Sequence, residues 1–171
     1  KGRVERPNLV RLGQISDLSN PDLAKFTLEY QVQSVLDKHR DFITLENLRN
    51  DITKMEARLS KVVSSSELKT LRIQIRERIR NRVMYEKIVD KLRVKIIHDI
   101  LYAAQIITGT LSSLGRHMMT VLSNSPKGIF ATIIDEACQA TEPSTLIALS
   151  YCRCKRLIRV GDPCQLPATV L

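Results

Sequence analysis

The chain has 171 residues, 43% of them hydrophobic and 26% charged, which suffices for one domain with a hydrophobic core and excludes wholesale disorder. No run approaches the roughly 18 apolar residues of a membrane span, and no signal-peptide pattern opens the chain, so a soluble intracellular protein with no membrane partner is expected. The formal net charge of +9 favours a polyanionic partner if the positive charge is clustered.

The first expected elements are a strand and the start of a helical segment. Residues 8–13 (NLVRLG) predict a short strand ending at Gly13, and a polar loop follows. Asn20-Pro21 then predicts a helix start, with proline in the first turn. From there to about residue 97 the chain contains no Gly or Pro, so the sequence offers no helix breaker.

Two apolar stripes within this segment predict a pair of helices. The first has the spacing 3, 4, 3, 4, 3 of a narrow packing seam and comprises Leu45, Leu48, Ile52, Met55, Leu59 and Val62. A capping box, Ser64-x-x-Glu67, then marks a new helix start. The second stripe begins regularly and continues less so, with Leu68, Leu71, Ile75, Ile79, Val83, Ile88, Leu92 and Ile96. We therefore expect two antiparallel helices joined near residues 61–66.

Nearly all the excess positive charge lies in this helical segment. Residues 38–95 hold sixteen basic and eight acidic residues, whereas residues 1–37 balance to zero and 96–171 carry a net +1. A clustered basic surface attracts nucleic acid, and the candidate contacts are Arg76, Arg78, Arg80 and Arg82. The alternative is a solvated helical face whose charge only maintains solubility.

After residue 100 short apolar strands alternate with helices. The expected order is a strand in AAQIITGT (103–110), a helix over about 111–122, a strand in GIFATII (128–134), a helix from Pro143 to about Tyr151, and a strand in KRLIRVGD (155–162). Such alternation predicts a parallel sheet with helices on both faces. Ligands of these sheets bind at the carboxyl ends of the strands, which here lie just after residues 109, 134 and 160.

The expected strand end at Ile134 runs directly into two carboxylates, Asp135 and Glu136. Adjacent carboxylates at the end of a buried strand need a compensating cation or hydrogen-bond network. In nucleoside triphosphatases an aspartate in this position holds Mg²⁺, and a neighbouring glutamate can deprotonate the attacking water. The alternative is an aspartate that only caps the following helix.

Two short motifs connect this edge to a known family. DEACQ (135–139) and GDPCQLP (161–167), together with NLVRLG, FTLEYQV (26–32) and AAQIITGTLSSLG (103–115), resemble superfamily 1 helicases of the senataxin and up-frameshift branch. The resemblance implies an α/β fold, namely part of a RecA-like parallel sheet interrupted by a long antiparallel helical hairpin. The expected segments are the start of the RecA-like part (1–21), the inserted hairpin (22–97) and the RecA-like continuation (98–171).

The resemblance also implies roles for individual residues. Asp135 corresponds to the Mg²⁺ ligand, Glu136 to the general base, and Gln165 to the glutamine that contacts the γ-phosphate of ATP. The implied network between the two loops adds Gln139, Gly161 and Asp162, with Gly161 permitting a tight turn after its strand. Thr110 and Ser112 correspond to residues that hold the nucleic-acid backbone, although Thr110 can equally be a helix N-cap.

Two residues depart from the family pattern, and the chain lacks several other groups. Cys164 stands where relatives often carry Lys or Asn, and Arg159 occupies a usually apolar strand position, which indicates an edge strand or a divergent protein. The four cysteines lack the usual spacing of a zinc site, so reduced, partly buried thiols are expected. The chain contains no G-x-x-x-x-G-K-[ST] phosphate-binding loop, and the second RecA-like domain that we expect after Leu171 lies outside these 171 residues.

The resulting hypothesis is a fragment of a nuclear, ATP- and Mg²⁺-dependent helicase that moves 5′ to 3′ on single-stranded RNA or DNA or on an RNA–DNA hybrid. Because the phosphate-binding loop is missing, we expect these 171 residues alone neither to bind ATP tightly nor to hydrolyse it. Two alternatives remain open: a non-catalytic module that binds nucleic acid or protein through the basic hairpin, and an inactive helicase-like scaffold.

Overall fold

The computed structural model describes residues 8–13, 21–115, 128–152, 154–164 and 168. These residues divide into two compact units, one formed by Lys1–Gln31 with Ile97–Leu171 and the other by Val32–Ile96. We call them the sheet unit and the hairpin unit. No helix among the described residues is long and apolar enough to cross a membrane.

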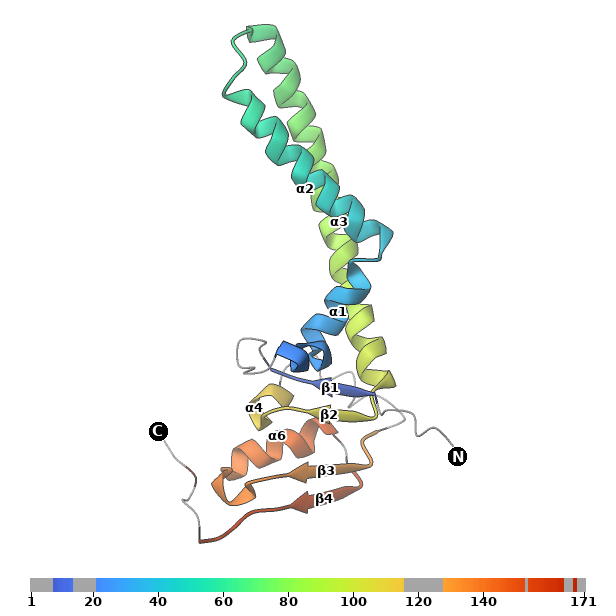
Figure 1. The fold of residues 1–171 in the computed structure, drawn as a ribbon, viewed down its shortest axis with the longest axis vertical. Helices are drawn as coiled ribbons and strands as arrows, with labels where there is room; N and C mark the ends of the chain where they lie inside the picture. Colours follow the sequence, from blue (N-terminus) through green and yellow to red (C-terminus); the bar gives the residue numbers. More distant parts are fainter. Residues whose placement is uncertain (1–7, 14–20, 116–127, 153, 165–167, 169–171) are drawn as a thin grey trace. The chain divides into compact units, whose positions relative to one another are not determined.

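Four short strands form the parallel pairs of the sheet unit (Figure 1). Strand β1 (Leu9–Arg11) pairs with β2 (Ile106–Thr108), and β3 (Ala131–Ile134) pairs with β4 (Arg156–Arg159). All four strands were expected, and the predicted α/β class with parallel pairing is confirmed. Among the described residues, however, they form two separate two-stranded ladders rather than one continuous sheet.

Helices α4 (Leu111–Leu114) and α6 (Glu142–Cys152) contact each other, and α6 also contacts β3. Ile134, Ala137 and Ala148 are buried together, and Leu111 and Leu114 of α4 pack against them. This small core places the end of β3 beside the segment that follows β2. The predicted helix beginning near Pro143 is confirmed as α6. Of the helix predicted over 111–122, only residues 111–115 lie within the described part of the chain.

The region around β1 is organised by a short 3₁₀ helix, η2 (Pro21–Phe26), and by the start of α1 (Leu28–Leu36). Thr27 is fully buried between them, and its hydroxyl donates to the carbonyl of Ala24 over 2.6 Å. The Gln31 amide donates to the carbonyls of Leu9 (3.0 Å) and Phe26 (3.3 Å). These bonds attach the first helical turns to the edge of β1.

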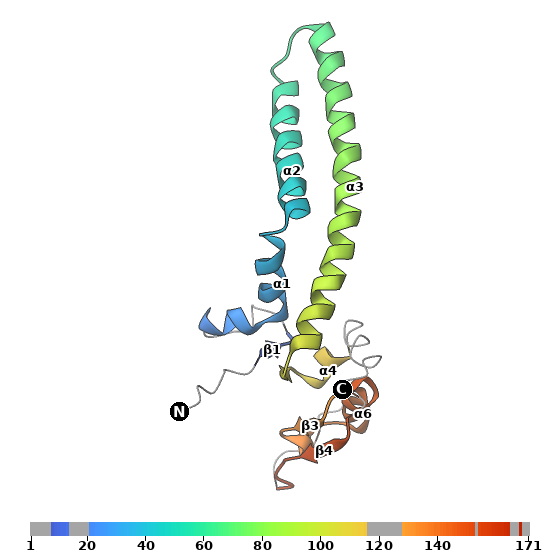
Figure 2. The same ribbon diagram turned by 90° about the vertical axis from the view of Figure 1, so that its right-hand side faces the viewer.

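Two antiparallel helices, α2 (Arg40–Leu59) and α3 (Ser65–Ala103), supply most of the hairpin unit (Figure 2). The chain turns at residues 60–64, close to the predicted 61–66. The hairpin unit buries Leu45, Leu48 and Ile52 of α2 and Leu71, Ile75, Val89 and Ile96 of α3. The first predicted stripe therefore contains the buried face of α2.

The second stripe was wrong at two positions. Val83 and Ile88 are 42% and 38% exposed, whereas Val89 is buried. The inner line of α3 instead follows residues 75, 82, 89 and 96, seven apart, so that Arg82 occupies a seam position. An apolar pattern overlooks such an arginine, although its aliphatic stem can cover apolar surface while the guanidinium stays partly solvated.

The first arm of the hairpin contains a break that the sequence did not predict. Helix α1 ends at Leu36 and α2 begins at Arg40. His39 is extended, with φ −87° and ψ 132°, and its Nδ1 accepts the backbone N–H of Asp41 over 3.3 Å. A histidine thus starts α2 as its N-cap. With neither Gly nor Pro nearby, the usual signals of a helix boundary are absent here.

Candidate functional site

The DEACQ and GDPCQLP segments meet at the carboxyl ends of β3 and β4. The two strands are parallel and in register, with Ile134 opposite Arg159, so the residues after both strands emerge at the same edge. The N–H of Val160 donates to the carbonyl of Ile134 over 2.9 Å, and the N–H of Ala137 donates to the carbonyl of Val160 over 2.8 Å. Two backbone hydrogen bonds therefore join the two motif loops.

Gly161 lies where these loops approach most closely. A Cβ atom at this position would stand 2.9 Å from the backbone nitrogen of Cys138, 3.0 Å from that of Ala137 and 3.0 Å from the Cys138 sulfur. Gly161 does not have a positive φ, unlike Gly13 and Gly128. A glycine is thus needed here because the loop contact leaves no room for a Cβ atom. In the sequence analysis, Gly161 was instead attributed to the backbone conformation of a tight turn.

Glu136 has an unusual backbone conformation. Its φ of 52° and ψ of 39° lie in the left-handed region, and it is the one described non-glycine residue with a positive φ. Such a conformation costs on the order of 1 kcal/mol or more and concentrates at functional sites. It directs the chain from β3 into the 3₁₀ turn η4 (Ala137–Gln139). No residue type in the sequence signals this strain, because glutamate rarely adopts it.

The carboxylates at this edge are exposed and lightly bonded. Asp135 Oδ1 accepts the N–H of Glu136 over 3.0 Å, and the Gln139 amide donates to Glu136 Oε2 over 3.4 Å. Asp162 Oδ1 accepts the N–H of Cys164 over 2.9 Å and so closes the turn after β4. Gln165, the predicted γ-phosphate contact, lies outside the described residues.

The carboxylates at this edge fit a magnesium ion whose remaining ligands come from water and from a phosphate-bearing substrate. No group of three or more His, Cys, Asp or Glu side chains in the described part of the chain could hold a metal by itself. Mg²⁺ is commonly bound through one or two carboxylates, with water and phosphate oxygens completing the octahedron. An exposed Asp135 at the end of β3 suits that role.

Thr110 caps helix α4. Its Oγ1 accepts the N–H of Ser113 over 3.2 Å and lies 2.9 Å from the Ser113 hydroxyl. The structural interpretation of Thr110 as an N-cap is therefore confirmed. Both Thr110 and Ser112 are exposed residues just after β2.

Arg11 is a candidate that the sequence interpretation missed. It is the last residue of β1 and pairs with Thr108, two residues before Thr110. Its Nη1 atom is buried without a hydrogen-bond partner in the described part of the chain. A buried guanidinium nitrogen with no partner is rare and suits an anionic ligand. The arginine in NLVRLG could have raised this suspicion, but burial cannot be read from a strand of three residues.

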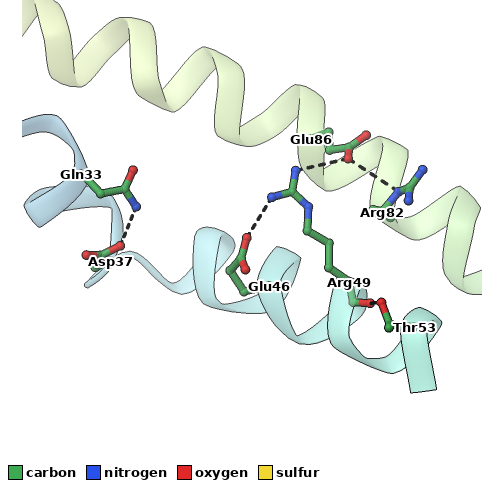
Figure 3. A network of polar contacts seen from close by, with 7 residues as sticks. All are labelled: Gln33, Asp37, Glu46, Arg49, Thr53, Arg82 and Glu86. Carbon is green, nitrogen blue, oxygen red and sulfur yellow. Dashed lines mark hydrogen bonds and ion pairs between the residues drawn. The ribbon is translucent and has the colours of Figure 1, made fainter. Parts of the chain in front are cut away.

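The four arginines predicted to contact nucleic acid fall into two classes. Arg78 Nη1 lies 3.5 Å from Asp51 Oδ2, and Arg82 Nε lies 3.6 Å from Glu86 Oε1. Figure 3 shows Glu86 between Arg82 and Arg49, with Arg49 Nη2 at 3.4 Å from the same carboxylate oxygen. Arg76 and Arg80 are exposed and take part in none of the ion pairs of the hairpin unit.

Comparison with known proteins supplies the family. The sequence profile of a family described as an AAA domain matches residues 1–171. The chain is 34% identical over 170 residues, or 99% of its length, to a probable helicase of Dictyostelium discoideum, and 30% identical over 201 aligned residues to the helicase SEN1 of Saccharomyces cerevisiae. The chain belongs to the senataxin-like superfamily 1 helicases.

The match to this helicase family is local in the relatives. The chain spans 14% of the Dictyostelium protein and 9% of SEN1. Over 83 residues it is 46% identical to the probable helicase MAGATAMA 3 of Arabidopsis thaliana, which covers 48% of the chain and 9% of that protein. The 171 residues thus match one part of each of these longer relatives.

Proposed function

We propose that this chain forms part of the first motor domain of an ATP-dependent nucleic-acid helicase. The observation that carries the proposal is the close approach of the DEACQ and GDPCQLP loops at Gly161. That contact brings two carboxylates and the turn before Gln165 to one edge of the β3–β4 ladder, the place where parallel sheets bind their ligands.

Within this site we assign Asp135 as the ligand of Mg²⁺ and Glu136 as the general base. Bound Mg²⁺ supplies a positive charge that neutralises the phosphate oxygens of ATP during hydrolysis. Glu136 accepts a proton from the attacking water, and the Gln139 amide at 3.4 Å orients that carboxylate. Asp162 closes the turn that precedes Gln165, the residue that we assign as the γ-phosphate contact. Gly161 allows the two loops to touch.

Hydrolysis requires groups outside these residues. The sequence holds no G-x-x-x-x-G-K-[ST] loop, which would supply the backbone N–H cradle and the lysine that bind phosphates. The 171 residues alone are therefore inactive in this proposal and contribute the carboxylate side of an ATP site completed by the full-length protein.

The proposed substrate is single-stranded RNA or DNA, or an RNA–DNA hybrid, along which the full-length protein moves 5′ to 3′ in the nucleus. These properties follow from the senataxin-like resemblance. Thr110 and Ser112 hold the phosphate backbone at the end of β2, and Arg11 adds a buried donor nearby. In the hairpin we restrict the nucleic-acid contacts to Arg76 and Arg80, because Arg78 and Arg82 already pair with carboxylates.

The test is Glu136→Gln in the full-length protein. Loss of a general base lowers the rate by about 10²- to 10⁴-fold. The rate of nucleic-acid-stimulated ATP hydrolysis should therefore decrease by that factor, whereas the affinity for RNA should not change. The matched control is Glu142→Gln, which removes an exposed carboxylate from the first turn of α6 and should retain full activity. Undiminished hydrolysis by the Glu136 variant would overturn the assignment.

The competing function is a non-catalytic binding module. It is favoured by the +8 charge of residues 38–95, which lies outside the carboxylate edge. This alternative predicts that the unmodified full-length protein binds RNA and does not hydrolyse ATP. The same assay, run on the unmodified protein, therefore separates the two.

A further inference from the structure

The outward face of α3 carries a continuous basic strip. Its members are Lys69, Arg76, Arg80, Lys87 and Lys91, separated by 7, 4, 7 and 4 residues. At 3.6 residues per turn these separations keep all five within about 60° of the helix circumference. The strip faces away from the seam line of residues 75, 82 and 89, and all five side chains are exposed.

The spacing contains an eleven-residue repeat. Lys69, Arg80 and Lys91 are eleven apart, as are Arg76 and Lys87, and Ile73 and Met84 occupy equivalent positions between them. Eleven residues make just over three full turns, so the strip runs nearly straight along the helix. At 1.5 Å per residue it is about 33 Å long, and its charges recur about every 6–10 Å.

We propose that this strip, the α3 strip, binds the phosphate backbone of single-stranded nucleic acid without reading its sequence. The inference rests on the proposed helicase function and adds Lys69, Lys87 and Lys91 as binding residues. In the described hairpin none of the five charges forms an ion pair, so all are available to phosphates. The nearest acidic residues, Glu77 and Asp90, lie at the two margins of the strip.

An acidic protein partner is the other chemistry that such a strip could attract. Protein interfaces bury a contiguous apolar centre from which charged residues are depleted. Here the exposed apolar residues on this side of α3 are Ile73 (63%), Val83 (42%), Met84 (51%) and Val94 (64%), and they are spread over 22 residues among basic side chains. That interleaving lacks an apolar centre, and a row of cations that recur every four or seven residues matches a linear polyanion better.

The inward arginines provide a control of equal charge. Replacing Arg78 and Arg82 removes two positive charges from α3, as does replacing Arg76 and Arg80. Only the second pair lies on the strip. A non-specific field effect would make the two double variants equal, whereas direct phosphate contact makes them differ.

The experiment measures binding of the full-length protein, without nucleotide, to a 30-nucleotide oligouridylate by fluorescence anisotropy at 50 and 200 mM KCl. Each phosphate contact to a single strand contributes about 0.7 to the slope of log affinity against log salt. Arg76→Gln with Arg80→Gln should therefore reduce the slope by about 1.4, which lowers the ratio of the two affinities about sevenfold. Lys87→Gln with Lys91→Gln should do the same.

Arg78→Gln with Arg82→Gln should leave the salt slope unchanged. Equal slopes for the outer and inner double variants would overturn the proposal, as would tighter binding of a 30-residue poly-glutamate than of the oligonucleotide. Glu136→Gln distinguishes this failure from failure of the proposed function, because it removes hydrolysis and leaves the salt slope intact.

Discussion

The two units of the chain achieve close contact in opposite ways. In the sheet unit the motif loops meet because Gly161 has no side chain, and backbone nitrogens of the DEACQ loop occupy the space that a Cβ would need. In the hairpin unit α2 and α3 meet through large side chains such as Leu45 and Ile52, which are almost fully buried. The loop contact therefore requires a residue without a side chain, whereas the hairpin requires large apolar side chains.

The largest expected effect comes from emptying the seam. Leu45→Ala removes a 1% exposed side chain from the hairpin and should destabilise that unit by about 2–5 kcal/mol. The measurement is amide hydrogen exchange across α2 and α3. Ile43→Ala, at a 46% exposed position on the same helix, is the control and should change exchange little. Similar protection in both variants would contradict the seam.

Adding an atom to the site should cost somewhat less. Gly161→Ala places a methyl group 2.9 Å from the Cys138 nitrogen, and overpacking of this kind typically costs about 1–3 kcal/mol. Exchange of the Ala137 and Val160 amides should accelerate, and ATP hydrolysis by the full-length protein should fall. Gly115→Ala is the matched variant: its new methyl meets a side-chain atom of Ile147 at 3.1 Å, which can move. Equal losses would show that backbone crowding is not the cause.

A smaller change should stabilise the sheet unit. The hydroxyl of Thr132 on β3 is buried without a hydrogen-bond partner in the described part of the chain. Thr132→Val keeps the shape and removes this unsatisfied group, so the thermal midpoint should rise by an amount equivalent to about 1 kcal/mol. In Thr145→Val the lost hydroxyl donates to the Thr141 carbonyl, and the midpoint should fall. A lower midpoint for the Thr132 variant would show that its hydroxyl is satisfied.

The smallest effect concerns the inner ion pairs. Arg78→Gln with Arg82→Gln should lower hairpin stability by less than about 1 kcal/mol, because the partners are 36–44% exposed and water screens them. Arg76→Gln with Arg80→Gln should leave stability unchanged, since these side chains have no carboxylate partner in the hairpin. Urea unfolding monitored at the hairpin compares the two. Greater destabilisation by the outer pair would reverse the assignment of faces.

The sequence predicted the strands and the carboxylate edge well. The continuous apolar run before Asp135 is typical of a parallel strand, whereas Arg159 interrupts the run before Gly161; the polar ends of both strands follow from topology alone. It failed where tertiary packing decides. The break at residues 37–39 uses a histidine N-cap, and the left-handed Glu136 leaves no compositional trace.

The inner line of α3 shows a second kind of failure. Counting only apolar residues moved the predicted stripe to Val83 and Ile88, whereas the seam continues through Arg82 to Val89. The polarity of a guanidinium hides its aliphatic stem from any pattern based on hydrophobicity. For the same reason four arginines were treated as one group in the sequence analysis. The structure places Arg78 and Arg82 on the side of α3 that faces the seam, and Arg76 and Arg80 on the strip.

The eleven-residue repeat of α3 has a consequence for how this helix can change length in evolution. Losing eleven residues rotates the remainder by only about 20°, and losing seven does so in the opposite sense, so seam and strip both survive. Losing two residues turns the rest of the helix by about 200°, which would bring Lys87 into the seam and expose Val89. We expect natural insertions and deletions in this helix to come in whole numbers of turns, seven or eleven residues at a time, and rarely in ones or twos.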